Sequence, residues 1–204
     1  MFEFSHTLAL IIITCVVSFV AWQQPAVLNR LIMWPPAVAQ RGQVDRFITH
    51  GFIHADGMHL LFNMFTLFFF GRVIENFYRP YLGGMGFALF YVSAIVVAML
   101  PSYWDHKNDA NYFSLGASGA VSAVLFAFIL FAPWSTIYVF FIPMPAIIFA
   151  VLYTAYSIWS SQRGRDNINH SAHLWGAAYG IAVTLLIEPN LISRFMQKLL
   201  HPVW

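Results

Sequence analysis

Three short polar motifs in this 204-residue chain contain residue types that could carry out chemistry. They occupy residues 59–63 (HLLFN), 116–119 (GASG) and 172–176 (AHLWG). A serine hydroxyl becomes a nucleophile when a nearby base, most often histidine, takes its proton. The oxyanion that then forms is stabilised by hydrogen-bond donors aimed at it. Taken together, the motifs predict a catalytic pair of Ser118 and His173, with His59 and Asn63 as donors.

The spacing within these motifs indicates which residues share a helix face. His59 and Asn63 are four residues apart and lie on one face, where they could donate to a site or hold two helices together. His173, Gly176 and Gly180 also share a face, and the Gly-xxx-Gly pair permits close approach of a neighbouring helix. If that neighbour is the serine-bearing helix, the two candidate catalytic residues meet. Otherwise His173 faces interfacial water.

Ser118 lies between two glycines at the start of an apolar run. Free N–H groups and the positive end of the helix dipole gather at such a start and can hold an oxyanion. Gly119, Ala123 and Ala127 also form a stripe of small residues, and this motif alone favours simple helix packing. A dyad fits better than a triad, because the acidic residues lie in loops or at the far end of the second apolar run: Asp105, Asp109, Asp166 and Glu75.

The amino-acid composition indicates whether such a pair would work in water or in a membrane. Sixty per cent of the residues are apolar and 9% are charged, against about 45–50% and about 25% in soluble domains. The chain therefore lacks the polar surface of a cytosolic enzyme, and we expect a helical membrane protein. The net charge of +2 gives no indication of nucleic acid as a partner.

A membrane-spanning helix needs roughly 20 mostly apolar residues. The sequence predicts an all-α, polytopic bundle of six spans in one domain, residues 1–204. The spans are expected at about 4–22, 58–77, 84–100, 116–131, 137–159 and 172–187. Pro143 and Pro145 should bend the fifth span or shift its start. Residues 189–204 are expected to form an amphipathic helix on the membrane surface.

Basic residues bear on the orientation of the six spans. The side with the termini has four: Arg72, Arg79, Arg194 and Lys198. The other side has six, which weakly favours it as cytoplasmic: Arg30, Arg41, Arg46, Lys107, Arg163 and Arg165.

With these motifs in this order, the chain resembles the rhomboid intramembrane serine proteases over nearly its whole length. The resemblance implies that Ser118 is the nucleophile and His173 the general base. It further implies an oxyanion hole formed by His59, Asn63 and the Ser118 backbone N–H, and shaped by Gly116 and Ala117. Supporting roles, either structural or through contacts with the catalytic groups, are implied for six further residues: His54 (as a donor), His170, Arg46, Glu75, Gly176 and Gly180. No metal or cofactor is implied.

Two positions depart from the family pattern. Asp45 precedes Arg46 where the family often has tryptophan, and Ser122 stands where many members carry a tyrosine stacked on the base. The orientation of His173 should therefore depend on other contacts. The chain looks like the minimal six-span form, without an appended soluble domain or a seventh helix.

Family topology places the termini in the cytoplasm and opens the dyad to the outside, contrary to the count of basic residues. A structural role for Arg46 reduces that count to four against five, and we adopt the family orientation in a bacterial cytoplasmic membrane. Residues 116–131 would span about 24 Å, less than a hydrocarbon core of about 30 Å. Ser118 would then lie below the membrane face, in a water-filled cavity within the lipid bilayer. Its polar lining would comprise His54, His59, Asn63, Ser118, Ser122, His170 and His173. The expected substrates are single-span or polytopic membrane proteins.

Two other functions fit parts of the pattern. A catalytically inactive relative could act in binding or quality control, although such relatives typically lack the serine or the histidine. A metal transporter could use the five histidines near one side, since imidazole is a common ligand, although no cysteine or acidic residue joins them inside the spans. These histidines are His50, His54, His59, His170 and His173.

Overall fold

The computed structural model describes residues 5–139, 141–163 and 168–201. Phe4, at the expected start of the first span, and the loop residues Arg165 and Asp166 lie outside the described residues. The first part of the chain consists of α1 (His6–Gln23), α2 (Pro25–Leu31), α3 (Pro35–Arg41), α4 (Arg46–Thr49) and the 3-10 turn η1 (His50–Phe52). The middle contains α5 (Gly57–Thr66), the π turn η2 (Leu67–Gly71), α6 (Arg72–Leu82), α7 (Gly86–His106) and α8 (Ser118–Phe131). The last part contains β1 (Thr136–Val139), β2 (Ile142–Pro145), α9 (Ala146–Ser161), α10 (His170–Ile187) and α11 (Leu191–Leu200).

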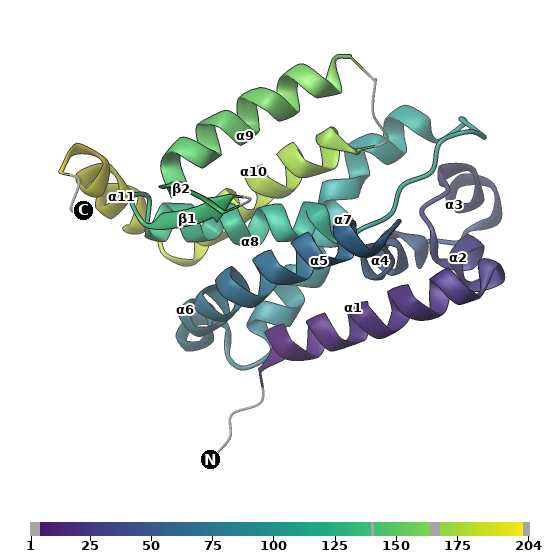
Figure 1. Cartoon of the computed structure of the whole chain (residues 1–204), viewed down its shortest axis with the longest axis horizontal. Helices are drawn as coiled ribbons and strands as arrows, with labels where there is room; N and C mark the ends of the chain where they lie inside the picture. Colours follow the sequence, from purple (N-terminus) through teal and green to yellow (C-terminus); the bar gives the residue numbers. More distant parts are fainter. Residues whose placement is uncertain (1–4, 140, 164–167, 202–204) are drawn as a thin grey trace.

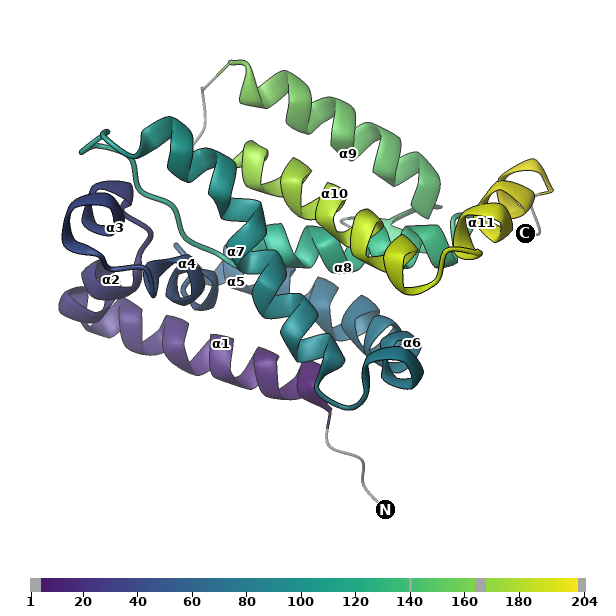
Figure 2. The same cartoon turned by 180° about the vertical axis from the view of Figure 1, so that it is seen from behind.

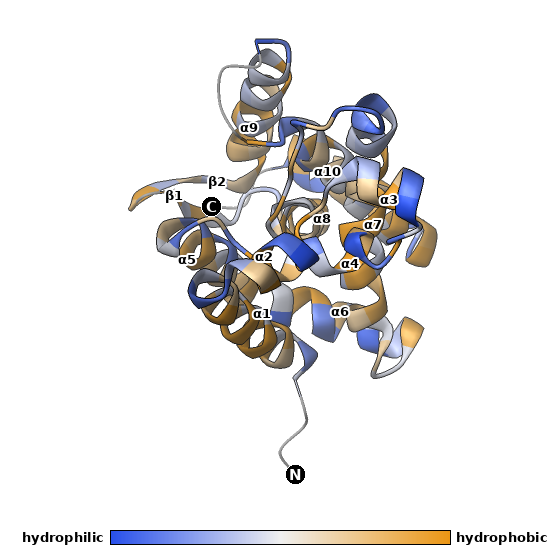
Figure 3. Ribbon diagram, turned by 90° about the vertical axis from the view of Figure 1, so that its right-hand side faces the viewer, coloured by the Kyte–Doolittle hydropathy of each residue, from blue (hydrophilic) through white to orange (hydrophobic). Residues whose placement is uncertain are grey.

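The helices form a bundle with α8 in its middle (Figures 1 and 2). Eleven of the 14 residues of α8 are buried. Helix α11 lies at one end of the bundle, and α2 and α3 lie at the other, next to the end of α1 (Figure 2). Hydrophobic residues cover the outward side of α1 (Figure 3), where Ile12, Val16 and Phe19 are more than half exposed. Such an apolar exterior suits a lipid environment.

Helix length and composition confirm the predicted all-α, polytopic class. Among the described residues, three helices are long and apolar enough to cross a membrane: His6–Gln23, Gly57–Leu82 and Gly86–His106. Helix α10 meets the same test only together with α11, from which it is bent by 113°. Helices α8 and α9 are shorter apolar helices. The count of six spans therefore stays a prediction.

The expected fifth span differs from the structure at its start. In place of a helix from Ile137, residues Thr136–Val139 and Ile142–Pro145 form an antiparallel hairpin. Proline has no backbone N–H for a helix, and it disfavours helical geometry in the residue before it. Helix α9 therefore begins at Ala146, directly after the second proline.

Three other helices have boundaries that differ from those expected from the sequence. Helix α8 begins at Ser118 rather than at residue 116, because Gly116 has a φ of 114° and cannot belong to a helix. Helix α10 begins two residues earlier than expected, at His170, where the Asn169 side chain accepts a hydrogen bond from the Ala172 backbone N–H. Helix α7 continues through Pro101 as far as His106.

Candidate active site

Ser118 and His173 lie within hydrogen-bonding distance at the starts of two adjacent helices. Ser118 is the first residue of α8, and His173 lies in the first turn of α10. The distance between Ser118 Oγ and His173 Nε2 is 2.8 Å. Both residues are partly exposed, whereas Gly116, Ala117 and Gly119 around the serine are buried. The arrangement can transfer a proton from the hydroxyl to the ring, which makes the oxygen nucleophilic.

Backbone contact between α8 and α10 sets the separation of these two residues. A Cβ atom added to Gly176 would lie 2.0 Å from the carbonyl oxygen of Gly119, and one added to Gly180 would lie 2.1 Å from that of Ala123. No real side chain fits at either distance, so glycine is required for the two helices to approach this closely. The Ser118–His173 distance is therefore a consequence of helix packing.

The backbone that leads into Ser118 is held by three histidines. The Gly116 N–H donates to the His50 carbonyl oxygen over 2.9 Å, and the Ala117 N–H donates to His54 Nε2 over 3.3 Å. The His59 ring lies against Gly116, since a Cβ there would meet His59 Cε1 at 2.7 Å. Gly116 also has a positive φ that favours glycine.

His54 is fully buried between α1 and the start of α8. Ser18 Oγ donates to the Phe52 carbonyl oxygen over 3.2 Å and lies 3.1 Å from His54 Nδ1. Because the hydroxyl hydrogen of Ser18 is donated to Phe52, His54 must donate to Ser18 through a hydrogen on Nδ1. Its Nε2 then has no hydrogen and accepts from the Ala117 N–H. Burial lowers the pKa of His54 to about 3, with a further contribution from His59, which keeps the ring neutral at neutral pH. The ring nitrogen that faces the site backbone is therefore an acceptor, whereas the resemblance implied a donor.

The other proposed donors lie on α5. Asp56 caps this helix by accepting from the His59 backbone N–H over 2.8 Å. The Asn63 side chain is buried and donates to the His59 carbonyl oxygen over 2.8 Å. The rings of His54 and His59 pack edge to face, with their centroids 4.9 Å apart. Among the described residues, no hydrogen bond joins His59 or Asn63 to Ser118, so their roles at the oxyanion hole stay predictions.

The supporting residues lie in different parts of the bundle. His170 is buried, and its ring packs edge to face against His173 at 5.7 Å. Arg46 is buried in the first loop, where it donates to Gln43 Oε1 over 2.7 Å and to the carbonyl oxygens of Asn29 and Ile32.

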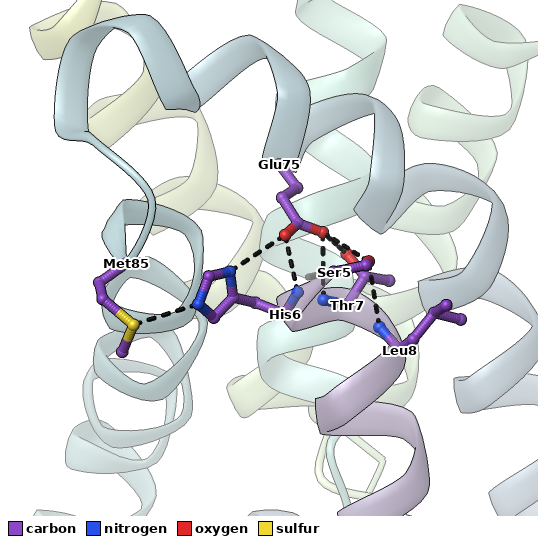
Figure 4. Close-up of polar contacts among 6 residues, drawn as sticks. All are labelled: Ser5, His6, Thr7, Leu8, Glu75 and Met85. Carbon is purple, nitrogen blue, oxygen red and sulfur yellow. Dashed lines mark hydrogen bonds and ion pairs between the residues drawn. The ribbon is translucent and has the colours of Figure 1, made fainter. Parts of the chain in front are cut away.

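The carboxylate of Glu75, another of the supporting residues, holds the start of α1 (Figure 4). It accepts from the backbone N–H groups of His6 and Thr7, at 2.7 and 3.1 Å, and from the hydroxyls of Ser5 and Thr7, at 3.0 and 2.7 Å. His6 Nδ1 is 3.1 Å from the same carboxylate. The site meets α1 at Ser18, eleven residues beyond Thr7 and about 16 Å along the helix. Glu75 therefore contacts the bundle far from the candidate dyad.

Two residues at the site were not predicted from the sequence. Tyr153 on α9 stacks on the His173 ring, with centroids 5.9 Å apart and planes at 21°. Asn169 caps α10 and ties it to neighbouring segments, through bonds with Ser102 at 3.0 Å and Tyr112 at 2.9 Å. An asparagine before an apolar run is a recognisable helix-cap signal, whereas nothing in the sequence spacing indicated the contact of Tyr153.

The histidines near the site do not assemble into a metal-binding set in the part of the chain that the structure describes. No group of three or more His, Cys, Asp or Glu side chains there could hold a metal ion. The contacts of His54 and His59 with backbone atoms of residues 116 and 117 account for their positions.

Comparison with known proteins agrees with these features. A family model described as the Rhomboid domain matches residues 41–190. RHOMBOID-like protein 12, mitochondrial, from Arabidopsis thaliana is 36% identical over 149 residues, which are 67% of this chain and 44% of that protein. Rhomboid protease GlpG from Enterobacter sp. (strain 638) is 28% identical over 80% of this chain and 55% of its own. Rhomboid protease GlpG from Salmonella paratyphi A is 28% identical over 91% of this chain and 64% of its own. The chain thus covers less than two thirds of the length of each of these relatives.

Proposed function

Because the chain belongs to the rhomboid family, we propose that it is an intramembrane serine endopeptidase that uses Ser118 and His173 as a catalytic dyad. The observation that carries the proposal is the 2.8 Å separation of Ser118 Oγ and His173 Nε2. Relatives that bear the name rhomboid protease support the same reaction class. The remaining contacts of the site suggest how each step would proceed.

In the first step, Ser118 Oγ attacks the carbonyl carbon of the scissile peptide bond while its proton passes to His173 Nε2. The carbonyl oxygen becomes an oxyanion at the N-terminus of α8. The Ala117 N–H is already bonded to His54, so the Ser118 N–H is the first helix N–H that can face the oxyanion. The His59 ring and the Asn63 amide are proposed as further donors.

In the following steps, the tetrahedral intermediate collapses and the C–N bond breaks. His173 donates its proton to the departing amine, which leaves an acyl ester on Ser118. Water then attacks the ester as His173 accepts a water proton. The second collapse returns that proton to Ser118 Oγ and releases the acid product. The partial exposure of both dyad residues gives water and substrate access to the reacting atoms.

The proposed substrates are membrane-anchored proteins. The apolar exterior and the apolar helices support a site within the lipid bilayer. The 14 residues of α8 span about 21 Å, less than a hydrocarbon core of about 30 Å, so a helix of this length can begin below the membrane face. A peptide bond inside a helix is shielded, and a substrate segment would have to unwind locally before Ser118 could reach it.

The chain is an integral membrane protein, as its family and its apolar helices require. The relatives include a mitochondrial protein and bacterial proteins. We propose a bacterial cytoplasmic membrane, with cytoplasmic termini and a site that opens to the outside. Labelling of single cysteines placed in residues 107–113 and at His201 with a membrane-impermeant maleimide on intact cells tests this orientation. Labelling at His201 alone would contradict it.

The decisive experiment uses the full chain reconstituted into liposomes with a panel of single-span substrates. We expect cleavage of at least one substrate, covalent labelling by a fluorophosphonate, and activity that survives EDTA. The Ser118→Ala and His173→Ala variants, checked for correct membrane insertion, should lose both cleavage and labelling. A wild-type protein that neither cleaves nor labels would favour an inactive, substrate-binding relative instead.

A further inference from the structure

The ring of the candidate base His173 is stacked by an aromatic side chain from a third helix. Tyr153 on α9 supplies the ring, and its hydroxyl lies 2.7 Å from the hydroxyl of Ser122 on α8. The same tyrosine lies 5.9 Å from the His173 ring, with the two planes only 21° apart. One side chain thus contacts both the serine-bearing helix and the base-bearing helix.

The geometry of Tyr153 suits a side chain that holds another ring in place. Its own ring is packed by Phe126 at 5.8 Å and by Phe149 at 5.3 Å. Offset stacking at centroid distances of about 4.5–7 Å is favourable for aromatic rings. The terminal torsion of a histidine has a broad preference, so packing must fix the plane of the His173 ring. Tyr153 on one side and the edge of His170 on another restrict that plane.

We propose that Tyr153 is the positioning residue that keeps Nε2 of His173 directed at Ser118, with Ser122 as the anchor of its hydroxyl. This inference rests on the proposed role of His173 as the base. It assigns to α9 a part in orienting the base. Ser122 and Tyr153 act together, because the hydroxyl of Ser122 lies 2.7 Å from that of Tyr153 and the ring of Tyr153 stacks on the base.

The location of Tyr153 makes the orientation of the base dependent on α9. Helix α9 lies on the outside of the bundle beside α10 (Figures 1 and 2). Only four of its 16 residues are buried, namely Ala146, Ala150, Ser157 and Ser160. A displacement of this weakly packed helix would withdraw the ring from His173, whereas the contact between α8 and α10 would remain. The catalytic distance therefore depends on α8 and α10, whereas the base orientation depends on α9 as well.

The test compares variants that separate the ring from the hydroxyl. Tyr153→Leu keeps apolar volume but removes the aromatic ring, and we expect kcat to fall by about ten- to a hundredfold with KM little changed. Tyr153→Phe keeps the ring and should lose less than about fivefold. The double variant Ser122→Tyr with Tyr153→Ala places a ring on α8 instead and should recover most of the rate lost in Tyr153→Ala. Leu152→Ala, a change at an exposed position of the same helix, is the matched control.

A second measurement does not depend on activity. In the Ser118→Ala background, the imidazole carbon resonances of His173, assigned by comparison with His173→Gln, should carry a ring-current shift from Tyr153. That shift should be lost in Tyr153→Leu and kept in Tyr153→Phe and Leu152→Ala. Unchanged His173 resonances in Tyr153→Leu would overturn the proposal, whatever happens to kcat. A wild-type protein without activity but with the expected shift would contradict the proposed function and leave the stacking role supported.

Discussion

The N-termini of α1 and α8 present the same chemical problem and solve it differently. Both have backbone N–H groups without partners inside the helix, and both attract negative charge. At α1 the carboxylate of Glu75 occupies the position permanently, and it accepts from two backbone N–H groups and two hydroxyls (Figure 4). At α8 the side chains that contact the start of the helix are those of His54, His59 and His173, and none of these is a carboxylate.

The free N–H groups at a helix N-terminus thus contribute to stability at α1. On the proposed mechanism, they contribute to catalysis at α8. Glu75 is only 4% exposed, so its charge depends on the donors of α1. Ser118 and His173 are partly exposed, and the negative charge at α8 would exist only while a peptide bond is being cleaved. A permanent anion beside Ser118 would compete with that transient one. Four predictions test this contrast.

The largest effect is expected from removal of the nucleophile. Ser118→Ala should abolish cleavage and fluorophosphonate labelling without lowering the thermal stability, because the change removes one partly exposed hydroxyl. Cleavage in liposomes and thermal denaturation in detergent measure the two properties on the same preparation. Retention of full activity would remove Ser118 from the mechanism.

The next largest effect is expected from the proposed oxyanion donors. His59→Ala or Asn63→Ala should lower kcat by about 10²–10³, the usual cost of one lost donor. Their effect on KM should be smaller, because the oxyanion forms only in the transition state. Steady-state kinetics with a cleavable single-span substrate provides the check. If neither variant changes kcat, the stabilisation must come from backbone N–H groups alone.

At α1 the expected loss is in stability. Glu75→Ala should lower the free energy of unfolding by about 3 kcal/mol, because several buried donors lose their acceptor together. Glu75→Gln keeps one carbonyl acceptor and should lose about 1 kcal/mol. Unfolding in mixed micelles measures both, with Glu188→Gln, at the partly exposed end of α10, as the control. Equal losses in the alanine and glutamine variants would show that the carbonyl acceptor kept by glutamine contributes nothing there.

The smallest effect concerns pH and the histidines that hold the backbone before α8. Burial lowers the pKa of His54 to about 3 and that of His50 to about 4, from an ordinary value of 6.5. Between these values and 6.5 the unfolded chain binds more protons than the folded one, so stability falls as the pH falls.

Thermal denaturation at pH 7 and pH 5 should therefore show a lower melting temperature at pH 5. The slope should decrease in His54→Gln and stay unchanged in His201→Gln, which alters an exposed histidine. A melting temperature that rises on acidification would contradict the neutral state assigned to His54.

The sequence allowed the helical class and the meeting of Ser118 with His173 to be predicted, because both depend on short, regular patterns. Apolar length indicates helices, and glycines at spacing four indicate where two helices can touch. The predicted helical start at Ile137 was wrong, because residues 136–139 and 142–145 form strands, whereas the expected shift of the helix start by the prolines is seen at Ala146. An apolar run that contains prolines can form a strand as well as a helix. The contact of Tyr153 with His173 joins residues 20 positions apart on different helices, and it depends on how α9 lies against α10.

The glycines of α10 have a consequence for judging which proteins of this kind are enzymes. Gly176 touches the backbone of Gly119 so closely that a single added methyl group would push the two helices apart. A homologous sequence could thus keep both the serine and the histidine and still be a pseudoenzyme because it has alanine at position 176. Under the proposed mechanism, a reliable sequence signature of activity must include the glycine at position 176 as well as the serine and the histidine.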